Sequence, residues 1–325
     1  MKKIVIDVQG ADAGLLPVVE GTVKALKQGV EFFPVLVGPA RELEAMLTDR
    51  GIPKDRYELV DALDAVTNED PPTCVFAGKE ESSLVKAYWY LKSNADCCAL
   101  VSPGSTGALL VGSICRLGLL PGLKFPVLAS ALPCSPEKMV CLVDCGANIE
   151  CTAADLVRFA KMGEVFSRCH CGIENPRVCL MNVGREAGKG TALTKEAYGL
   201  LQELPLNFVG NLEGSDIVSG YADVIVTDGF SGNILLKSTE AAGKLAMQIV
   251  AEAGADADPA LIKKLQQAIF EKLEFNSQGA ATFLGPKKIV VKMHGCANAD
   301  TTVSAICHAL HLNDTGFIEA MGKAL

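Results

Sequence analysis

The sequence predicts an α/β protein with a mainly parallel sheet that is covered by helices on both faces. The predicted strands are continuous apolar runs with little alternation, which is typical of strands buried on both sides. Stretches with helical spacing separate most of these strands, as the crossovers of a parallel sheet require. Glycine occurs with Asn, Ser, Thr or Asp at several points where a strand gives way to a helix, and ligands bind at such points in open α/β sheets.

The elements follow one another as strand, turn and helix along most of the chain. The first strand runs into Gly10, the second is stopped by Gly38 and Pro39, and Ser82 or Ser83 is expected to cap the helix after the third. Strands are predicted at Lys3–Val8, Phe33–Val37, Tyr57–Val60, Cys98–Val101, Val127–Ala131, Val140–Asp144, Val178–Val183, Asn207–Val209, Val224–Thr227 and Ile289–Met293. Helices are predicted at Pro17–Gln28, Arg41–Arg50, Ser82–Ser93, Thr106–Leu117, Ala153–Cys169, Thr194–Glu203, Asn233–Glu252 and Pro259–Leu273.

Length and composition favour one large α/β domain over residues 1–325. A chain of 325 residues fits about two average domains or one large unit, and the lack of an internal repeat or low-complexity linker favours the single domain. With 49% hydrophobic and 21% charged residues, wholesale disorder is excluded. The formal net charge of −8 gives no general attraction to nucleic acid, so we expect no nucleic-acid partner.

The 13 cysteines are expected to be mostly small core residues in a reducing cytoplasm. The N-terminus reaches the acidic Asp7 without the apolar stretch of a signal peptide, and no window approaches 18 apolar residues. Cys169 and Cys171 form the only Cys-x-Cys pair, and no second ligand pair lies at a suitable spacing. We therefore expect a cytoplasmic protein without a metal site.

Four strand ends carry the glycine-rich loops: Val101–Ala108, Val143–Asn148, Met181–Gly190 and Val226–Asn233. Glycine lets backbone N–H groups converge, and the N-terminus of the following helix favours an anion. The Walker spacing is absent, and no loop matches GxGxxG with an acidic residue at the next strand end. The pattern therefore predicts an anion site and no nucleotide cofactor.

These motifs resemble the phosphate acyltransferase (PlsX) family of bacterial phospholipid synthesis over nearly the whole chain. The resemblance is carried by Gly104–Ala108, Leu142–Asn148, Phe159–Gly163, Gly172–Arg177, Asn182–Gly184 with Lys189 and Gly190, Phe208–Glu213, Ala222–Asn233 with Lys237, and His294 with Gly295. It implies an α/β/α fold of three layers, similar to phosphotransacetylases and isocitrate dehydrogenases. It also implies that acyl-[acyl-carrier protein] and inorganic phosphate give acyl phosphate and free carrier protein, without a cofactor.

The resemblance also implies site residues and partners. The expected catalytic residues are Asn182, Lys189, Asn233, Lys237 and His294. The expected substrate- and phosphate-binding residues are Asp7, Gly10, Ser105, Thr106, Gly107, Asp144, Asn148, Gly184, Asn211, Asp228 and Gly232. A homodimer and a downstream glycerol-phosphate acyltransferase are the implied protein partners. These residue types suit the reaction. Phosphate is already anionic at neutral pH, and a thiol of pKa ~8.5 leaves readily. The site therefore mainly has to neutralise the charge of phosphate and to stabilise the tetrahedral oxyanion.

The sequence departs from the family pattern in loops that face the ligands. The family's His-Gly-Ser-Ser is His294-Gly-Cys-Ala297 here, and Gly-Asn-Thr-Gly is Gly104-Ser-Thr-Gly107. Cys296 and Cys98 could act as nucleophilic thiols or be small residues in packed turns. Two further functions stay open: a relative that uses another thioester and forms acetyl phosphate, as in glycine reductase, and a non-catalytic scaffold paralogue.

A helical hairpin, which the resemblance places at about Ser238–Glu274, bears on membrane contact. Its turn, Ala251–Pro259, carries Glu252, Asp256 and Asp258 and no bulky apolar residue, whereas a membrane-docking tip needs apolar and basic side chains. Leu245, Ile249, Leu261, Leu265 and Ile269 are expected to pack the two helices together. Membrane contact is therefore expected to be weak or absent.

Overall fold

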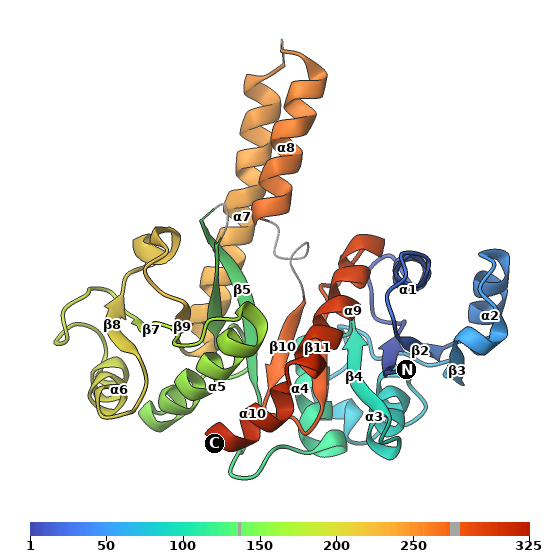
Figure 1. Ribbon diagram of the computed structural model, residues 1–325, viewed down its shortest axis with the longest axis horizontal. Helices are drawn as coiled ribbons and strands as arrows, with labels where there is room; N and C mark the ends of the chain where they lie inside the picture. Colours follow the sequence, from blue (N-terminus) through green and yellow to red (C-terminus); the bar gives the residue numbers. More distant parts are fainter. Residues whose placement is uncertain (136–137, 256, 274–279) are drawn as a thin grey trace. The chain divides into compact units, whose positions relative to one another are not determined.

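The computed structural model describes residues 1–135, 138–255, 257–273 and 280–325. The chain divides into two compact units, shown with the whole chain in Figure 1: unit 1 spans 1–126, 279–323 and 325, and unit 2 spans 127–278 and 324. The single-domain interpretation stays a prediction.

Unit 1 is built on a mostly parallel set of strands. Its strands are β1 (Lys3–Asp7), β2 (Phe33–Gly38), β3 (Glu58–Asp61), β4 (Cys97–Ser102), β10 (Ala281–Leu284) and β11 (Ile289–Lys292). They lie in the order β3-β2-β1-β4-β11-β10; β10 runs antiparallel to β11, and the other neighbouring pairs are parallel. Ile4, Val5 and Ile6 are all fully buried. Since successive side chains of a strand point to opposite faces, β1 is covered on both.

The helices of this part of the chain include a close helix–helix contact. They are α1 (Leu16–Lys27), α2 (Ala40–Asp49), α3 (Ser83–Ser93), α4 (Thr106–Gly112), α9 (Ala299–Asp314) and α10 (Phe317–Ala324), and a π-helical turn at Ser113–Leu117 continues α4. A Cβ atom on Gly21 of α1 would lie 2.3 Å from Cβ of Thr302 on α9. Glycine at this position therefore lets the two helices approach.

Unit 2 places four parallel strands side by side. Its strands are β5 (Val127–Ser135), β6 (Lys138–Val143), β7 (Val178–Met181), β8 (Phe208–Leu212) and β9 (Val224–Val226). In the order β5-β6-β9-β7-β8, the β5–β6 pair is antiparallel and the other pairs are parallel. The helices are α5 (Ala153–Cys171), α6 (Ala192–Gln202), α7 (Gly229–Ala253) and α8 (Pro259–Leu273). The α/β class and the mainly parallel sheet predicted from the sequence are confirmed.

Helices α7 and α8 form the predicted hairpin, which extends away from the strands of unit 2 in Figure 1. A Cβ atom on Gly254 would lie 1.9 Å from Cδ1 of Ile262, so the helices meet closely at the turn. Asp258 accepts a hydrogen bond from the backbone N–H of Ala260 at 2.9 Å and so caps the start of α8. Asp256, predicted to add charge at this turn, lies outside the described residues.

The predicted packing of the hairpin is wrong for four of its five residues, and the fifth, Ile269, is half-buried. Leu245, Ile249, Leu261 and Leu265 are 57%, 54%, 50% and 43% exposed, so they do not mainly pack the two helices together. Helical spacing indicates which residues share a face, and it does not indicate what covers that face. Within the described part of the chain, no helix combines the length and apolar character needed to cross a membrane.

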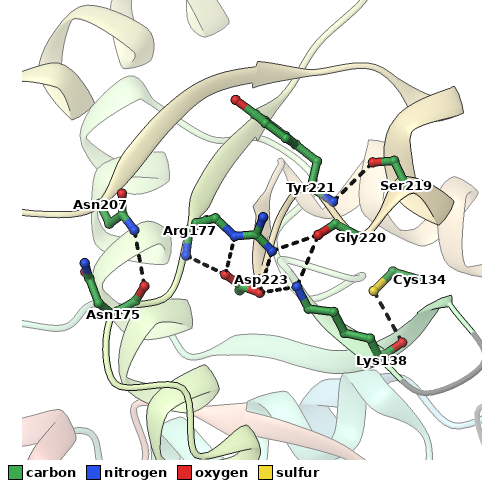
Figure 2. A network of polar contacts seen from close by, with 9 residues as sticks. All are labelled: Cys134, Lys138, Asn175, Arg177, Asn207, Ser219, Gly220, Tyr221 and Asp223. Carbon is green, nitrogen blue, oxygen red and sulfur yellow. Dashed lines mark hydrogen bonds and ion pairs between the residues drawn. The ribbon is translucent and has the colours of Figure 1, made fainter.

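An ion-pair network ties together the amino ends of strands in unit 2 (Figure 2). The Asp223 carboxylate accepts hydrogen bonds from the backbone N–H of Arg177 at 2.8 Å and from its Nε at 2.9 Å. Lys138 Nζ lies 2.7 Å from Asp223 Oδ1 and donates to the carbonyl of Gly220. Burial alone would raise the pKa of Asp223, but the hydrogen bonds from Arg177 and Lys138 outweigh it and lower the pKa to about 2.

We expect Asp223→Asn to lower the free energy of unfolding by about 2 kcal/mol at pH 7, because it leaves two cations without their shared carboxylate. The value is below that of a fully buried pair since Arg177 and Lys138 are 35% and 34% exposed. Urea unfolding of the wild-type protein and the variant measures the difference. Glu319→Gln, which breaks the exposed pair with Lys323, is the control and should leave the unfolding midpoint unchanged; equal midpoints for all three proteins would contradict the assigned role of Asp223.

Candidate functional site

The candidate site in unit 2 lies where parallel strands end together. Strands β6, β9, β7 and β8 run in the same direction, so their carboxyl ends share one edge. The backbone N–H of Asp144 donates to the carbonyl of Thr227 at 3.0 Å, and that of Asn182 donates to Leu212 at 2.9 Å. Three of the glycine-rich loops therefore leave the same edge of this unit.

A buried carboxylate organises the loop after β6. Asp144 is fully buried, and its Oδ1 accepts hydrogen bonds from the backbone N–H groups of Gly146 and Ala147 at 3.0 and 2.9 Å. Its Oδ2 accepts from the backbone N–H and the Nδ2 of Asn148, both at 2.7 Å. Burial raises the pKa of Asp144, and these loop hydrogen bonds act against that rise. Asp144 thus shapes the loop from inside.

The first turns of α7 pack directly on this loop. The backbone N–H of Gly229 donates to the carbonyl of Asn148 at 2.7 Å. A Cβ atom on Gly232 would lie 1.9 Å from the carbonyl oxygen of Asp144, and one on Gly146 would lie 3.4 Å from Oδ1 of Asn233. Glycine is thus required at Gly232 by a close approach. The predicted residues Asp144, Asn148, Gly232 and Asn233 are brought together here.

Asn182 closes the loop after β7 on itself. Its Nδ2 donates to the carbonyl of Lys189 at 3.1 Å, and its Oδ1 accepts from the backbone N–H of Val183 at 2.9 Å. Gly190 has a φ of +95°, and a Cβ there would lie 2.2 Å from Asn182 Oδ1. Lys189 is exposed, and within the described chain no carboxylate is paired with its ammonium.

Gly184 and Asn211 belong to the same loop region. A Cβ on Gly184 would lie 3.0 Å from Lys189 Cγ. Asn211, only 4% exposed, donates from Nδ2 to the carbonyl of Glu186 at 2.9 Å. Its Oδ1 is buried and has no hydrogen-bond partner among the residues that the structure describes. Asn211 therefore holds the loop after β7 through its amide nitrogen, and its amide oxygen is a buried acceptor that this loop does not use.

A cavity of about 210 Å³ opens between the ends of β7 and β9. Its lining residues are Leu156, Leu180, Met181, Asn182, Val183, Gly190, Thr191, Thr194, Thr227, Asp228 and Ser231. Thr191 and Asp228 are the N-caps of α6 and α7, so two helix N-termini border the cavity. Both Asp228 oxygens accept hydrogen bonds from Ser231. Helix N-termini and hydroxyl groups are suited to bind a small anion.

The predicted set falls into two neighbouring groups at this edge. Asn182 and Asp228 line the cavity, and Lys189 adjoins it through Gly190. Asn148 and Asn233 lie instead at the Asp144 loop. Lys237 lies two turns into α7 and pairs with Glu240 at 2.7 Å. These residues share a strand edge, but the described cavity does not include all of them.

The remaining predicted residues belong to unit 1, again at strand ends. Asp7 ends β1 and is 1% exposed; its Oδ2 accepts from the hydroxyl of Ser102 at 2.7 Å. The Ser102 oxygen in turn accepts from the backbone N–H of Gly104 at 3.0 Å. Gly10, at φ +91°, packs on Gly104, since a Cβ on Gly10 would lie 3.1 Å from Gly104 Cα. Burial raises the pKa of Asp7 to about 6, against hydrogen bonds from Ser83, Ser102 and Gln9.

The start of α4 and the loop after β11 complete this group. Ser105 is the N-cap of α4 and accepts from the backbone N–H of Ala108, Thr106 is its first residue, and Gly107 packs on Pro72. His294 Nδ1 lies 2.9 Å from Cys296 Sγ.

Sequence reasoning named Ser105 and Thr106 but missed four other hydroxyl side chains. Ser102 links the Asp7 and Gly104 loops, and Thr191, Thr194 and Ser231 line the cavity. A signal existed, since Thr191 precedes Thr194 by three residues at a helix start, which is capping spacing. Among the described residues, no group of three or more His, Cys, Asp and Glu side chains is arranged to hold a metal ion.

Comparison with solved structures defines the class of fold. A branched-chain phosphotransacylase from Enterococcus faecalis aligns over 96% of this chain and 98% of its own, with a TM-score of 0.58 and 15% identity. A phosphotransacetylase from Streptococcus pyogenes aligns over 96% and 94%, with a TM-score of 0.58 and 18% identity. The protein therefore has a phosphotransacylase-like α/β fold, as predicted; the likeness to isocitrate dehydrogenases stays a prediction.

Sequence comparison identifies the family. A profile described as "Fatty acid synthesis protein" matches residues 2–320. A "Phosphate acyltransferase" of Alkaliphilus oremlandii is 36% identical over 99% of this chain and 97% of its own length. One of Exiguobacterium sp. is 37% identical over 99% and 98%. The chain belongs to this fatty acid synthesis protein family, the phosphate acyltransferase family that the motifs indicated.

The raised pKa of Asp7 makes a prediction about stability and pH. Because the folded protein holds this proton more tightly than the unfolded chain, Asp7 contributes most below about pH 4, and that contribution is lost as pH rises through about 6. Asp7→Asn is uncharged throughout, so its stability relative to the wild-type protein should rise by about 2–3 kcal/mol between pH 4 and pH 7. Urea unfolding at several pH values measures this, with the exposed Asp49→Asn as the control; identical pH profiles for wild-type protein and Asp7→Asn would contradict the prediction.

Proposed function

We propose that this protein is a phosphate acyltransferase that converts acyl-[acyl-carrier protein] and inorganic phosphate to acyl phosphate and free carrier protein. The observation that carries the proposal is the hydroxyl-lined cavity between the N-termini of α6 and α7, in a chain related over 99% of its length to proteins named phosphate acyltransferase. This full-length similarity favours the phosphate acyltransferase over the acetyl phosphate-forming and scaffold alternatives.

We propose that phosphate binds in the cavity of unit 2. The N-terminus of α6 supplies partial positive charge, and Thr191 and Thr194 supply hydroxyl groups, whereas the Ser231 hydroxyl at the start of α7 already donates to the Asp228 carboxylate. Lys189 adds a full charge at the adjoining loop. Holding the anion in this way lowers the entropic cost of its attack and needs no general base, because phosphate is already ionised at neutral pH.

The acyl transfer then requires a phosphate oxygen to attack the thioester carbonyl carbon. The resulting tetrahedral oxyanion needs hydrogen-bond donors, and we assign Asn233 and Lys237 on α7 to this task. The carbon–sulfur bond breaks and the carrier thiolate leaves without much assistance, since its conjugate thiol has a pKa of roughly 8.5. Asp144 and Asn148 keep the loop under α7 in place. His294, Ser105 and Thr106, at the strand ends of unit 1, stay predicted substrate-binding residues.

The direct test is incubation with acyl-carrier protein and phosphate, with acyl phosphate trapped by hydroxylamine and measured as the phosphate-dependent part of the hydroxamate. We expect Lys189→Ala to raise KM for phosphate roughly 10- to 100-fold, because a charged contact is worth roughly 1.5–3 kcal/mol. Lys263→Ala, which removes an exposed lysine on α8, should keep the wild-type KM. An absence of phosphate-dependent hydroxamate would contradict the function, and an unchanged KM would contradict the role of Lys189.

We further propose a cytoplasmic homodimer that supplies acyl phosphate to a glycerol-phosphate acyltransferase. The exposed Leu245, Ile249, Leu261 and Leu265 of the hairpin support a second copy of this chain as the partner that covers them. Light scattering that gives a monomer mass at micromolar concentration would exclude the dimer.

Weak or absent membrane binding follows from the charge of the hairpin turn. Glu252 and Asp258 are exposed there, and an anionic bilayer repels carboxylates. We therefore expect the purified protein to stay in the supernatant when it is sedimented with anionic liposomes at physiological salt. Cosedimentation that is lost when the turn is shortened would show that this turn docks on membranes.

A further inference from the structure

The loop after β11 places a thiol and an imidazole in direct contact. Cys296 Sγ lies 2.9 Å from His294 Nδ1, and the backbone N–H of Cys296 donates to the same nitrogen at 3.2 Å. Because a backbone donor points at Nδ1, this nitrogen carries a lone pair and the ring proton sits on Nε2. The thiol is therefore the donor in the S–H···N contact. His294 is poised to receive the thiol proton.

Cys296 is also accessible, which sets it apart from most other thiols of the chain. Of the 13 cysteines, Cys296 and Cys307 are the exposed ones. The other candidate thiol, Cys98, donates to the carbonyl of Lys3 at 3.3 Å, and burial raises its pKa. Burial also raises the pKa of Cys307, and no hydrogen bond joins Cys307 to an imidazole among the described residues. Cys296 combines access with a neighbouring base.

The loop that carries Cys296 is held in place on both sides. Before it, the backbone N–H of Asp12 donates to the carbonyl of Gly295 at 2.8 Å, and a Cβ on Gly295 would lie 3.0 Å from the Asp12 carboxylate. After it, Asn298 caps α9 together with Thr301. The thiol is thus presented by a fixed turn.

This turn lies at the strand edge of unit 1 where the predicted substrate loops begin. Strands β1, β4 and β11 are parallel neighbours, so the loops that carry Gly10, Ser105 and Cys296 leave the same edge. The loop contact between Asp12 and Gly295 joins the first and last of them directly. A ligand bound at this edge would meet the thiol.

We propose that Cys296 is an acyl-acceptor thiol that takes the acyl group from the thioester substrate, with His294 as its general base. The inference rests on the proposed function for the identity of the acyl donor. Sγ attacks the carbonyl carbon as its proton passes to Nδ1 of His294. The bond from that carbon to the carrier sulfur breaks, and the proton passes from Nδ1 to the leaving thiolate. One thioester replaces another, and no oxidant or reductant is consumed. The inference thus replaces direct attack on the carrier thioester by two steps, in the second of which phosphate attacks the acyl-enzyme and the bond from the carbonyl carbon to Cys296 Sγ breaks.

The test is peptide mass spectrometry of the full chain after incubation with octanoyl- or palmitoyl-carrier protein in the absence of phosphate. We expect an acyl adduct on Cys296, its loss in Cys296→Ala, and wild-type labelling in Cys307→Ala. His294→Asn keeps an acceptor near Nδ1 but removes the base, and should slow adduct formation at least 100-fold, as expected for a lost general base. Failure of wild-type Cys296 to acylate, or equal labelling of Cys307, would overturn the inference, as would an unchanged rate in His294→Asn.

A measurement on the wild-type protein tests the inference even if the variants fold poorly. Iodoacetamide should alkylate Cys296 at least about tenfold faster than Cys307 in the native state, because an imidazole contacts Cys296 and none is hydrogen-bonded to Cys307 among the described residues. Equal rates would overturn the inference. ³¹P NMR with phosphate present separates this inference from the function. Formation of acyl phosphate without an acyl adduct on Cys296 would contradict only the acyl-acceptor role. An acyl adduct on Cys296 without acyl phosphate would contradict only the proposed function.

Discussion

The candidate site of unit 2 depends on one buried carboxylate and on what packs against it. Asp144 accepts hydrogen bonds from three successive backbone N–H groups and from the Asn148 side chain. This charge is removed from water, so its hydrogen bonds are strong and its loss would leave several donors unpaired. Helix α7 packs on the same loop through Gly229 and Gly232. One carboxylate therefore fixes both the loop after β6 and the start of the helix that carries Asn233 and Lys237.

This arrangement changes how the predicted asparagines are understood. The Nδ2 of Asn148 donates to Asp144, and that of Asn182 donates to the carbonyl of Lys189. Both side chains thus hold their own loops, as Asn does in many turns. The backbone groups and hydroxyls that these loops present would then be the direct contacts for the proposed phosphate. In this view the asparagines are needed for the geometry of the site more than for contact with phosphate.

The fold was largely predictable because its strands are buried on both faces and read as apolar runs. The site region was predictable because glycine and hydroxyl or amide residues mark the strand ends. Helix α9 was missed because Thr301, Thr302 and His308 are buried in it, so its buried face does not look apolar; His308 Nε2 lies 2.7 Å from the Thr282 hydroxyl. The exposed stripe of the hairpin was misassigned because a periodic pattern carries no information about its partner. The cavity itself required coordinates, since it forms between loops that are about 40 residues apart in sequence.

Helix α7 runs without interruption from the site to the tip of the hairpin. Its 25 residues span roughly 37 Å at 1.5 Å per residue. Near the N-terminus of α7, Gly232 packs closely against the backbone of Asp144. A rotation of α7 about its axis would therefore displace the loop after β6. The exposed apolar residues near the other end, Leu245 and Ile249, therefore lie on the same rigid helix as Asn233 and Lys237 of the proposed site. A partner that bound Leu245 and Ile249 more tightly in one position of α7 than in another would be coupled to the loop, and the coupling would be equal in both directions.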